Sequence, residues 1–263
     1  MRIDEKANLL RNLPQLCILS VLAMTIGAAA ARAQPTPENG YYARTNTFGI
    51  ISAYSVDSSH ILLGDAENRM LLNFGVSYSR RLLLNRIVNW QYNGELLPVA
   101  LESEPVVHYI NIQTSPAPMT YISNTTQVEA CVAKSGSYDD TITFNGGSIT
   151  YIGTWTQTCE RRWTNGEAMS PVGLQWNFLP RHKMQPFFIG HGGYMYSTQP
   201  IPLMTAGSFN FTFDFGTGLE LYRSQTRSIR AEYRYHHISN HGTAGDNPGI
   251  DNGLFQVTYS FGR

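Results

Sequence analysis

Hydrophobic and polar residues alternate with a period of two along most of this chain. Residues 72–78 place Leu, Phe, Val and Tyr on one face and Asn, Gly and Ser on the other. The same alternation recurs in residues 88–93, 172–178, 209–221 and 255–261. Such segments predict β-strands whose two faces meet different surroundings.

The two faces of these segments differ in a way that favours a membrane barrel over a soluble sandwich. The apolar faces are large and aromatic on nearly every segment, more than a single core of this size needs, whereas the polar faces carry small residues that fit a narrow lumen. We therefore expect an all-β fold, an eight-stranded antiparallel transmembrane β-barrel, which leaves no unpaired strand edge in the hydrocarbon. The expected strands start near Thr47, Met70, Ile87, Ser170, Gln185, Phe209, Ser228 and Asn252.

The lengths of the connections agree with this topology. With both termini on the periplasmic side, the periplasmic turns fall near Asn85, Arg181 and Ser224 and are short, while the outer connections are longer. The longest is an extracellular insertion over residues 102–168, which we expect to fold over the barrel mouth as a hairpin. Cys131 and Cys159 lie within it; a disulfide is the favoured interpretation in an exported chain, and a catalytic thiol the alternative.

The first 33 residues are typical of a secretory signal peptide: a basic start, an apolar run and the small-residue site Ala31-Arg32-Ala33. A transmembrane anchor is the alternative, although the run is short and interrupted by polar residues. The expected mature barrel comprises residues 34–263, with 15 basic and 17 acidic residues. This balance provides no basic surface, so it argues against nucleic acid as a partner.

The seventh expected strand carries the candidate chemistry. Its charged face, with Arg230, Glu232 and Arg234, must line the lumen, because charges facing lipid are costly, and the alternating signs indicate a paired ladder there. Parity then places His237 and Ser239 on the lipid side, and the next strand places Asp251 there too. These are a base, a nucleophile and an orienting acid for ester hydrolysis.

Two other interpretations of the same residues remain open. His237 and Ser239 could simply meet water at the aromatic girdle of the barrel. A zinc site from His236, His237 and His241 is a third interpretation, although His236 and His237 point to opposite faces of a strand.

At these residues the sequence resembles a known family. His237-Ile238-Ser239-Asn240 followed by Asn247-Pro248-Gly249-Ile250-Asp251 is similar to the lipid A 3-O-deacylases, outer-membrane acyl hydrolases of the PagL type, over roughly Phe187 to Phe261. The resemblance implies His237 as base, Ser239 as nucleophile, and support of the oxyanion by Asn240, Gly242 and Asn247. Asp251 stands where well-known members have glutamate, so it is expected to reach the imidazole only if the hairpin adjusts.

The resemblance implies an outer-membrane acyl-ester hydrolase that removes a 3-hydroxyacyl chain from lipid A. Its implied partners are lipid A or lipopolysaccharide as substrate and the surrounding outer-membrane lipid, and a homodimer is a compatible assembly. Neither a metal nor a cofactor is expected. The alternatives are a structural or adhesive barrel whose site has decayed, and an esterase for phospholipids or small esters.

Overall fold

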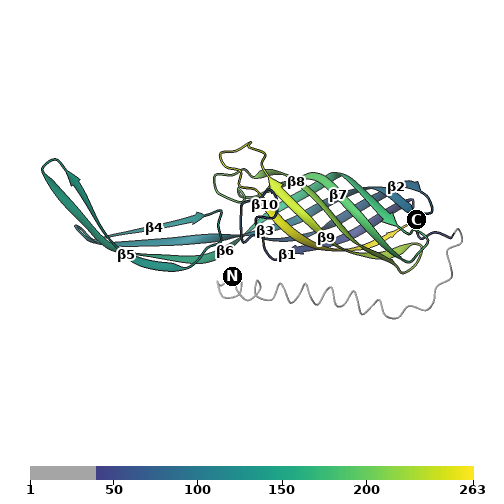
Figure 1. Cartoon of the computed structure of the whole chain (residues 1–263), viewed down its shortest axis with the longest axis horizontal. Coiled ribbons are helices and arrows are strands. Elements are labelled where there is room, and N and C mark those ends of the chain that lie inside the picture. Colours follow the sequence, from purple (N-terminus) through teal and green to yellow (C-terminus); the bar gives the residue numbers. More distant parts are fainter. Residues whose placement is uncertain (1–39) are drawn as a thin grey trace. The chain divides into compact units, whose positions relative to one another are not determined.

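The computed structural model describes residues 40–263, which form ten β-strands and their connections (Figure 1). The expected signal peptide, residues 1–33, lies outside the described part of the chain. The strands are β1 (Asn46–Ser55), β2 (Met70–Leu84), β3 (Val88–Ser115), β4 (Met119–Thr126), β5 (Lys134–Phe144), β6 (Gly147–Phe178), β7 (Met184–Ser197), β8 (Phe209–Tyr222), β9 (Arg227–Ser239) and β10 (Ile250–Gly262). Among residues 40–263, no helix is long and apolar enough to cross a membrane.

Eight of these strands close into an antiparallel barrel. The ring runs β1-β2-β3-β6-β7-β8-β9-β10, closed by the pairing of β10 with β1 and of β3 with β6. Seven of the eight expected strand starts lie within two residues of the observed ones. The exception is β6, which begins at Gly147 rather than near Ser170. The expected fold class, an eight-stranded β-barrel, is confirmed.

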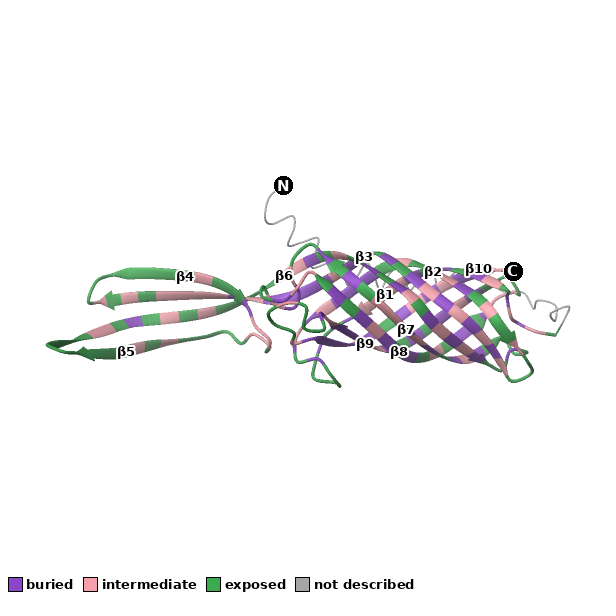
Figure 2. Cartoon of the chain, turned by 90° about the horizontal axis from the view of Figure 1, so that it is seen from above, coloured by how far each residue is buried: buried purple, intermediate pink, exposed green. Residues whose placement is uncertain are grey.

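The barrel is polar inside and apolar outside. On β8, Asn210, Asp214 and Glu220 are buried, whereas Phe211 and Leu219 between them are exposed. Figure 2 shows the same alternation of buried and exposed positions around the barrel. This is the inverse of a soluble protein, and it is stable where hydrocarbon surrounds the wall.

Side chains fill the lumen through ion pairs and hydrogen bonds. Arg234 donates to both carboxylate oxygens of Glu95, at 3.0 and 2.8 Å, and also contacts Asp214 at 3.2 Å and Glu232 at 3.1 Å. The predicted charge ladder is therefore present on the inner face of β9. These groups compensate one another's charge in the closed interior of the barrel.

The insertion between the third and fourth barrel strands continues the barrel wall. β3 and β6 stay paired beyond the barrel as far as Ser115 and Ile152, and β4 and β5 add to their outer edges in the order β4-β3-β6-β5. We call this part, β4 and β5 with residues 103–115 and 147–165, the extension sheet. The expected hairpin folded over the barrel mouth is wrong. The β3–β4 and β5–β6 turns lie where Pro116, Pro118 and Gly146 interrupt the strands, so the β3–β6 ladder extends up to those points; residues 127–133 connect β4 to β5.

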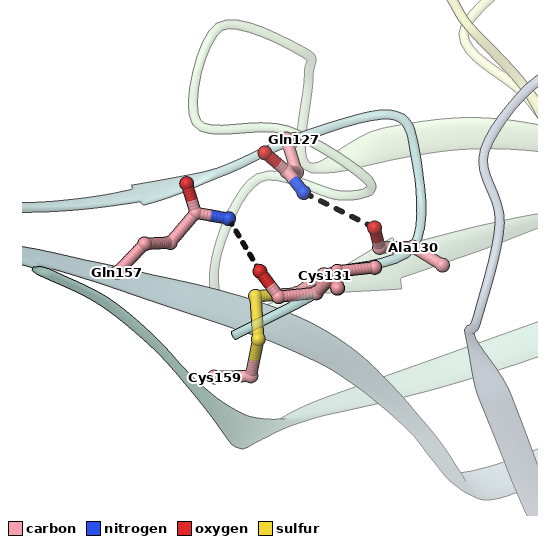
Figure 3. The surroundings of a disulfide bond; sticks show 6 residues. Gln127, Ala130, Cys131, Gln157 and Cys159 are labelled. Carbon is pink, nitrogen blue, oxygen red and sulfur yellow. Dashed lines mark hydrogen bonds between the residues drawn. A yellow bond between two sulfur atoms is a disulfide. The ribbon is translucent and has the colours of Figure 1, made fainter. Parts of the chain in front are cut away.

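The predicted disulfide is present in the extension sheet. Cys131, in the connection between β4 and β5, is bonded to Cys159 on β6 (Figure 3). Beside it, the Gln157 side chain donates to the carbonyl of Val132 at 2.9 Å. The disulfide and this hydrogen bond therefore link the connection between β4 and β5 to β6.

Candidate active site on the outer wall of the barrel

Strand register brings the predicted base and acid together. His237 on β9 lies directly opposite Asp251 on β10. The Nδ1 atom of His237 and the Oδ1 atom of Asp251 are 2.6 Å apart. Side chains of directly opposed residues start only about 5 Å apart at Cβ, so the short aspartate side chain reaches the imidazole within a regular antiparallel pair. The expected adjustment of the hairpin is not needed.

The Asp251 carboxylate is fully buried, and hydrogen-bond donors surround it. Its Oδ1 atom also accepts from the hydroxyl of Tyr235 at 2.7 Å. Its Oδ2 atom accepts from the backbone N–H groups of Leu62 at 2.7 Å and Leu63 at 2.8 Å, both in the connection between β1 and β2. Four donors on two oxygens favour the ionised acid and fix its orientation.

His237 is held in a closed environment, with 7% of its surface exposed. The ring of Phe213, its neighbour on β8, lies 5.1 Å away between centroids. Gly249, directly before β10, has a φ of +65°, and a Cβ at this position would lie 3.1 Å from Cε1 of His237. With Asp251 ionised, Nδ1 of His237 donates to it, which leaves Nε2 as the proton acceptor.

Ser239 ends β9 two residues beyond His237, on the same face of the strand. Its hydroxyl donates to Oδ1 of Asn247 at 3.1 Å, and its Oγ atom accepts from the backbone N–H of His241 at 3.1 Å. Within residues 40–263, therefore, the serine hydroxyl is bonded to the following loop and not to His237. In this structure His237 is hydrogen-bonded to Asp251, whereas Ser239 is hydrogen-bonded to Asn247 and to the backbone of His241.

The loop after β9 folds around Asn240 and Asn247. Oδ1 of Asn247 also accepts from the backbone N–H of Asn240 at 3.0 Å, and the Asn240 side chain accepts from the N–H of Gly242 at 2.8 Å. His241 and Gly242 both adopt positive φ angles, 53° and 75°. Of the predicted oxyanion-binding region, the His241 N–H is the group directed at Ser239, while Asn240, Gly242 and Asn247 shape the loop that presents it.

The geometry does not bring the three histidines of the zinc interpretation together. His236 faces the lumen, where its Nδ1 atom lies 3.8 Å from Oδ2 of Asp214, while His237 contacts Asp251 on the outer wall. No group of three or more His, Cys, Asp or Glu residues suited to a metal ion occurs in the described part of the chain.

Sequence reasoning missed several residues of this site. Tyr235 was detectable, because it shares the parity of His237 and lies two residues before it. Phe213 belongs to a strand that was predicted, but its role depends on strand register. Leu62 and Leu63 carried no signal, because their contribution is made by the backbone and depends on a loop that lies far from Asp251 in sequence.

The fold and the site define a class of protein: a membrane β-barrel that carries a buried histidine–acid pair on its outer wall. Residues 132–260, which hold all of the predicted site residues except Cys131, match the family model described as lipid A 3-O-deacylase (PagL). The match begins well before Phe187, where the sequence resemblance began, and includes β5 and β6. This is a family of hydrolases of the outer membrane, so the predicted outer-membrane location is confirmed.

Among solved structures, Neisserial surface protein A (NspA) matches with 10% sequence identity and a TM-score of 0.39, over 82% of this chain and 97% of that chain. No curated protein matches the chain.

Proposed function

We propose that this protein is an outer-membrane esterase that removes an ester-linked 3-hydroxyacyl chain from lipid A. The observation that carries the proposal is the His237–Asp251 pair, 2.6 Å apart and buried in the outer wall, with Ser239 on the same face of β9. The family match to lipid A 3-O-deacylases supports the substrate class. A hydrolytic site on the lipid-facing wall suits a substrate whose acyl chains lie in the membrane.

The first step is attack by Ser239. Its hydroxyl turns from Asn247 towards Nε2 of His237, the imidazole takes the proton, and Oγ forms a bond with the ester carbonyl carbon. Asp251 stabilises the imidazolium through Nδ1. The His241 N–H, already 3.1 Å from Oγ, donates to the developing oxyanion.

The ester bond then breaks, and His237 returns its proton to the departing sugar oxygen of lipid A. Water next attacks the acyl-serine and loses its proton to His237. The acyl–Oγ bond then breaks, and His237 returns this proton to Oγ of Ser239. The products are a free 3-hydroxy fatty acid, lipid A with one acyl chain fewer, and regenerated Ser239. Every proton moves through Nε2 of His237, so the sequence of steps needs no further reactant.

The direct test is to incubate the purified, detergent-folded barrel with lipid A and to identify the released fatty acid by mass spectrometry. A parallel incubation with a diacyl phospholipid tests the esterase alternative. We expect release of a 3-hydroxy fatty acid from lipid A alone. Release from the phospholipid alone would replace lipid A as the substrate, and no release from either would favour a structural or adhesive barrel.

A further inference from the structure

The connection between β1 and β2, residues 56–69, folds back against the start of β10. We call it the 56–69 loop. Its Asp65 N–H donates to the carbonyl of Pro248 at 2.6 Å, and its Ala66 N–H donates to the carbonyl of Gly249 at 3.0 Å. The Asn-Pro-Gly motif before Asp251 is therefore docked onto a loop from the other end of the chain. The loop and the acid-bearing strand form one hydrogen-bonded unit.

Buried polar side chains hold the base of the 56–69 loop closed. The Ser58 hydroxyl donates to the carbonyl of Ala66 at 2.6 Å and accepts from the N–H of Arg69 at 2.9 Å. From β10, the Asn252 side chain donates to Ser55 Oγ at 2.9 Å and to the carbonyls of Asp57 at 3.0 Å and Arg69 at 3.1 Å. These contacts connect the two ends of the loop to the residue that follows Asp251, so the loop has a defined conformation at the site.

The 56–69 loop contacts Asp251 through its backbone. Leu62 and Leu63 direct their N–H groups at Oδ2 of the carboxylate, while their side chains are 65% and 58% exposed. This leaves Oδ1 for His237 and Tyr235. Two donors on one oxygen prevent the carboxylate from rotating away from the imidazole.

Gly64 lets the loop come this close. A Cβ at this position would lie 2.5 Å from the backbone nitrogen of Asp251 and 2.9 Å from its Cγ atom, both too short for any side chain. A residue larger than glycine would therefore push the loop off the acid. The close approach of Gly64 and the hydrogen bonds from Leu62 and Leu63 together hold the loop against Asp251.

We infer that the 56–69 loop is a positioning element of the active site, in which the Leu62 and Leu63 amides hold Asp251 against His237. The inference rests on the proposed function for its catalytic consequence, but its structural content is independent of the substrate. An aspartate has one bond fewer to adjust than a glutamate, so its alignment depends more on such external donors. Misplacement of a catalytic group by about 1 Å lowers rates by roughly a hundredfold.

The test compares two disruptive variants with two matched controls. Gly64→Ala displaces the loop, and Leu63→Pro removes one donor. Gly147→Ala adds a Cβ whose nearest neighbour is Phe144 Cε2 at 3.8 Å, an ordinary contact, and Ala117→Pro places a proline at an exposed position of the turn between β3 and β4. Folding of each barrel is monitored by its heat-dependent gel mobility, and kcat and KM are measured for fatty acid release from lipid A.

We expect kcat to fall by about 10- to 100-fold in Gly64→Ala and Leu63→Pro with KM little changed, and both controls to keep the parent kcat. The strongly deshielded proton NMR signal of the His237 Nδ1–H should be lost in the same two variants. Folded variants that keep both kcat and this signal would overturn the inference. If either variant does not fold, Asp251→Ala provides an independent test. The amide resonances of Leu62 and Leu63 must shift in this variant if these amides bind the Asp251 carboxylate. Unchanged resonances would also overturn the inference.

A parent protein that releases no fatty acid would refute the proposed function only. The NMR measurements would still decide whether the loop positions Asp251. Failure of the two ideas can therefore be told apart.

Discussion

Replacing Asp251 by asparagine tests the role of the acid without changing its shape. In the parent protein, His237 and Tyr235 donate to Oδ1, and Leu62 and Leu63 donate to Oδ2. An amide has one oxygen and one NH₂ group, so in either orientation its NH₂ faces two donors. Asparagine also favours the imidazole tautomer with its proton on Nε2, which cannot accept the proton of Ser239. Loss of the acid in this way costs on the order of 10⁴-fold in kcat, or roughly 5 kcal/mol of transition-state stabilisation.

The assay is fatty acid release from lipid A by the purified variant, measured as kcat at saturating substrate. Asp139→Asn is the matched control, because Asp139 is exposed on β5 in the extension sheet. The control should keep the parent rate. An Asp251→Asn variant that folds and keeps more than about a tenth of the parent kcat would refute the assigned role of the acid, because the predicted loss is far larger.

Two further predictions concern the barrel interior and the extension sheet. Arg234→Ala should lower the free energy of unfolding by about 3–5 kcal/mol, because it removes the arginine that Glu95, Asp214 and Glu232 share in the lumen. Urea unfolding in lipid vesicles, followed by tryptophan fluorescence, measures this against Arg86→Ala, which alters an exposed turn; equal midpoints would contradict the interior ladder. Replacing Cys131 and Cys159 together by serine removes a cross-link across 28 residues, worth roughly 3–4 kcal/mol, so hydrogen exchange should quicken in β4 and β5 while fatty acid release stays unchanged. A parallel loss of activity would show that the extension sheet contributes to the site.

The barrel was predictable because its two faces meet different solvents. Lipid outside and a packed polar lumen inside impose a strict period of two, which places strand starts such as Met70 and Phe209 at their observed positions. The same parity correctly separated Arg234, in the lumen, from His237 on the outer wall. For the barrel, the alternation of polar and apolar residues thus predicts both the strands and the face on which each side chain lies.

The parts that could not be predicted depend on contacts rather than on alternation. In the extension sheet, burial no longer alternates regularly along β3 and β6, so the residue pattern gave no sign that the barrel strands continue through it. The contact of Leu62 and Leu63 with Asp251 arises only because barrel closure pairs β1 with β10. The bond between Ser239 and Asn247 depends on the conformation of the loop after β9, which sequence spacing does not determine.

The measurement that tests the central claim most directly is mass spectrometry of lipid A after incubation with the parent protein, with Ser239→Ala, and with Ser208→Ala as a matched control. Ser208 is half-buried in the loop before β8 and has no part in the proposed chemistry. The account predicts that the parent and Ser208→Ala remove one 3-hydroxyacyl chain and that folded Ser239→Ala leaves lipid A intact. Deacylation by Ser239→Ala at the parent rate would contradict the account.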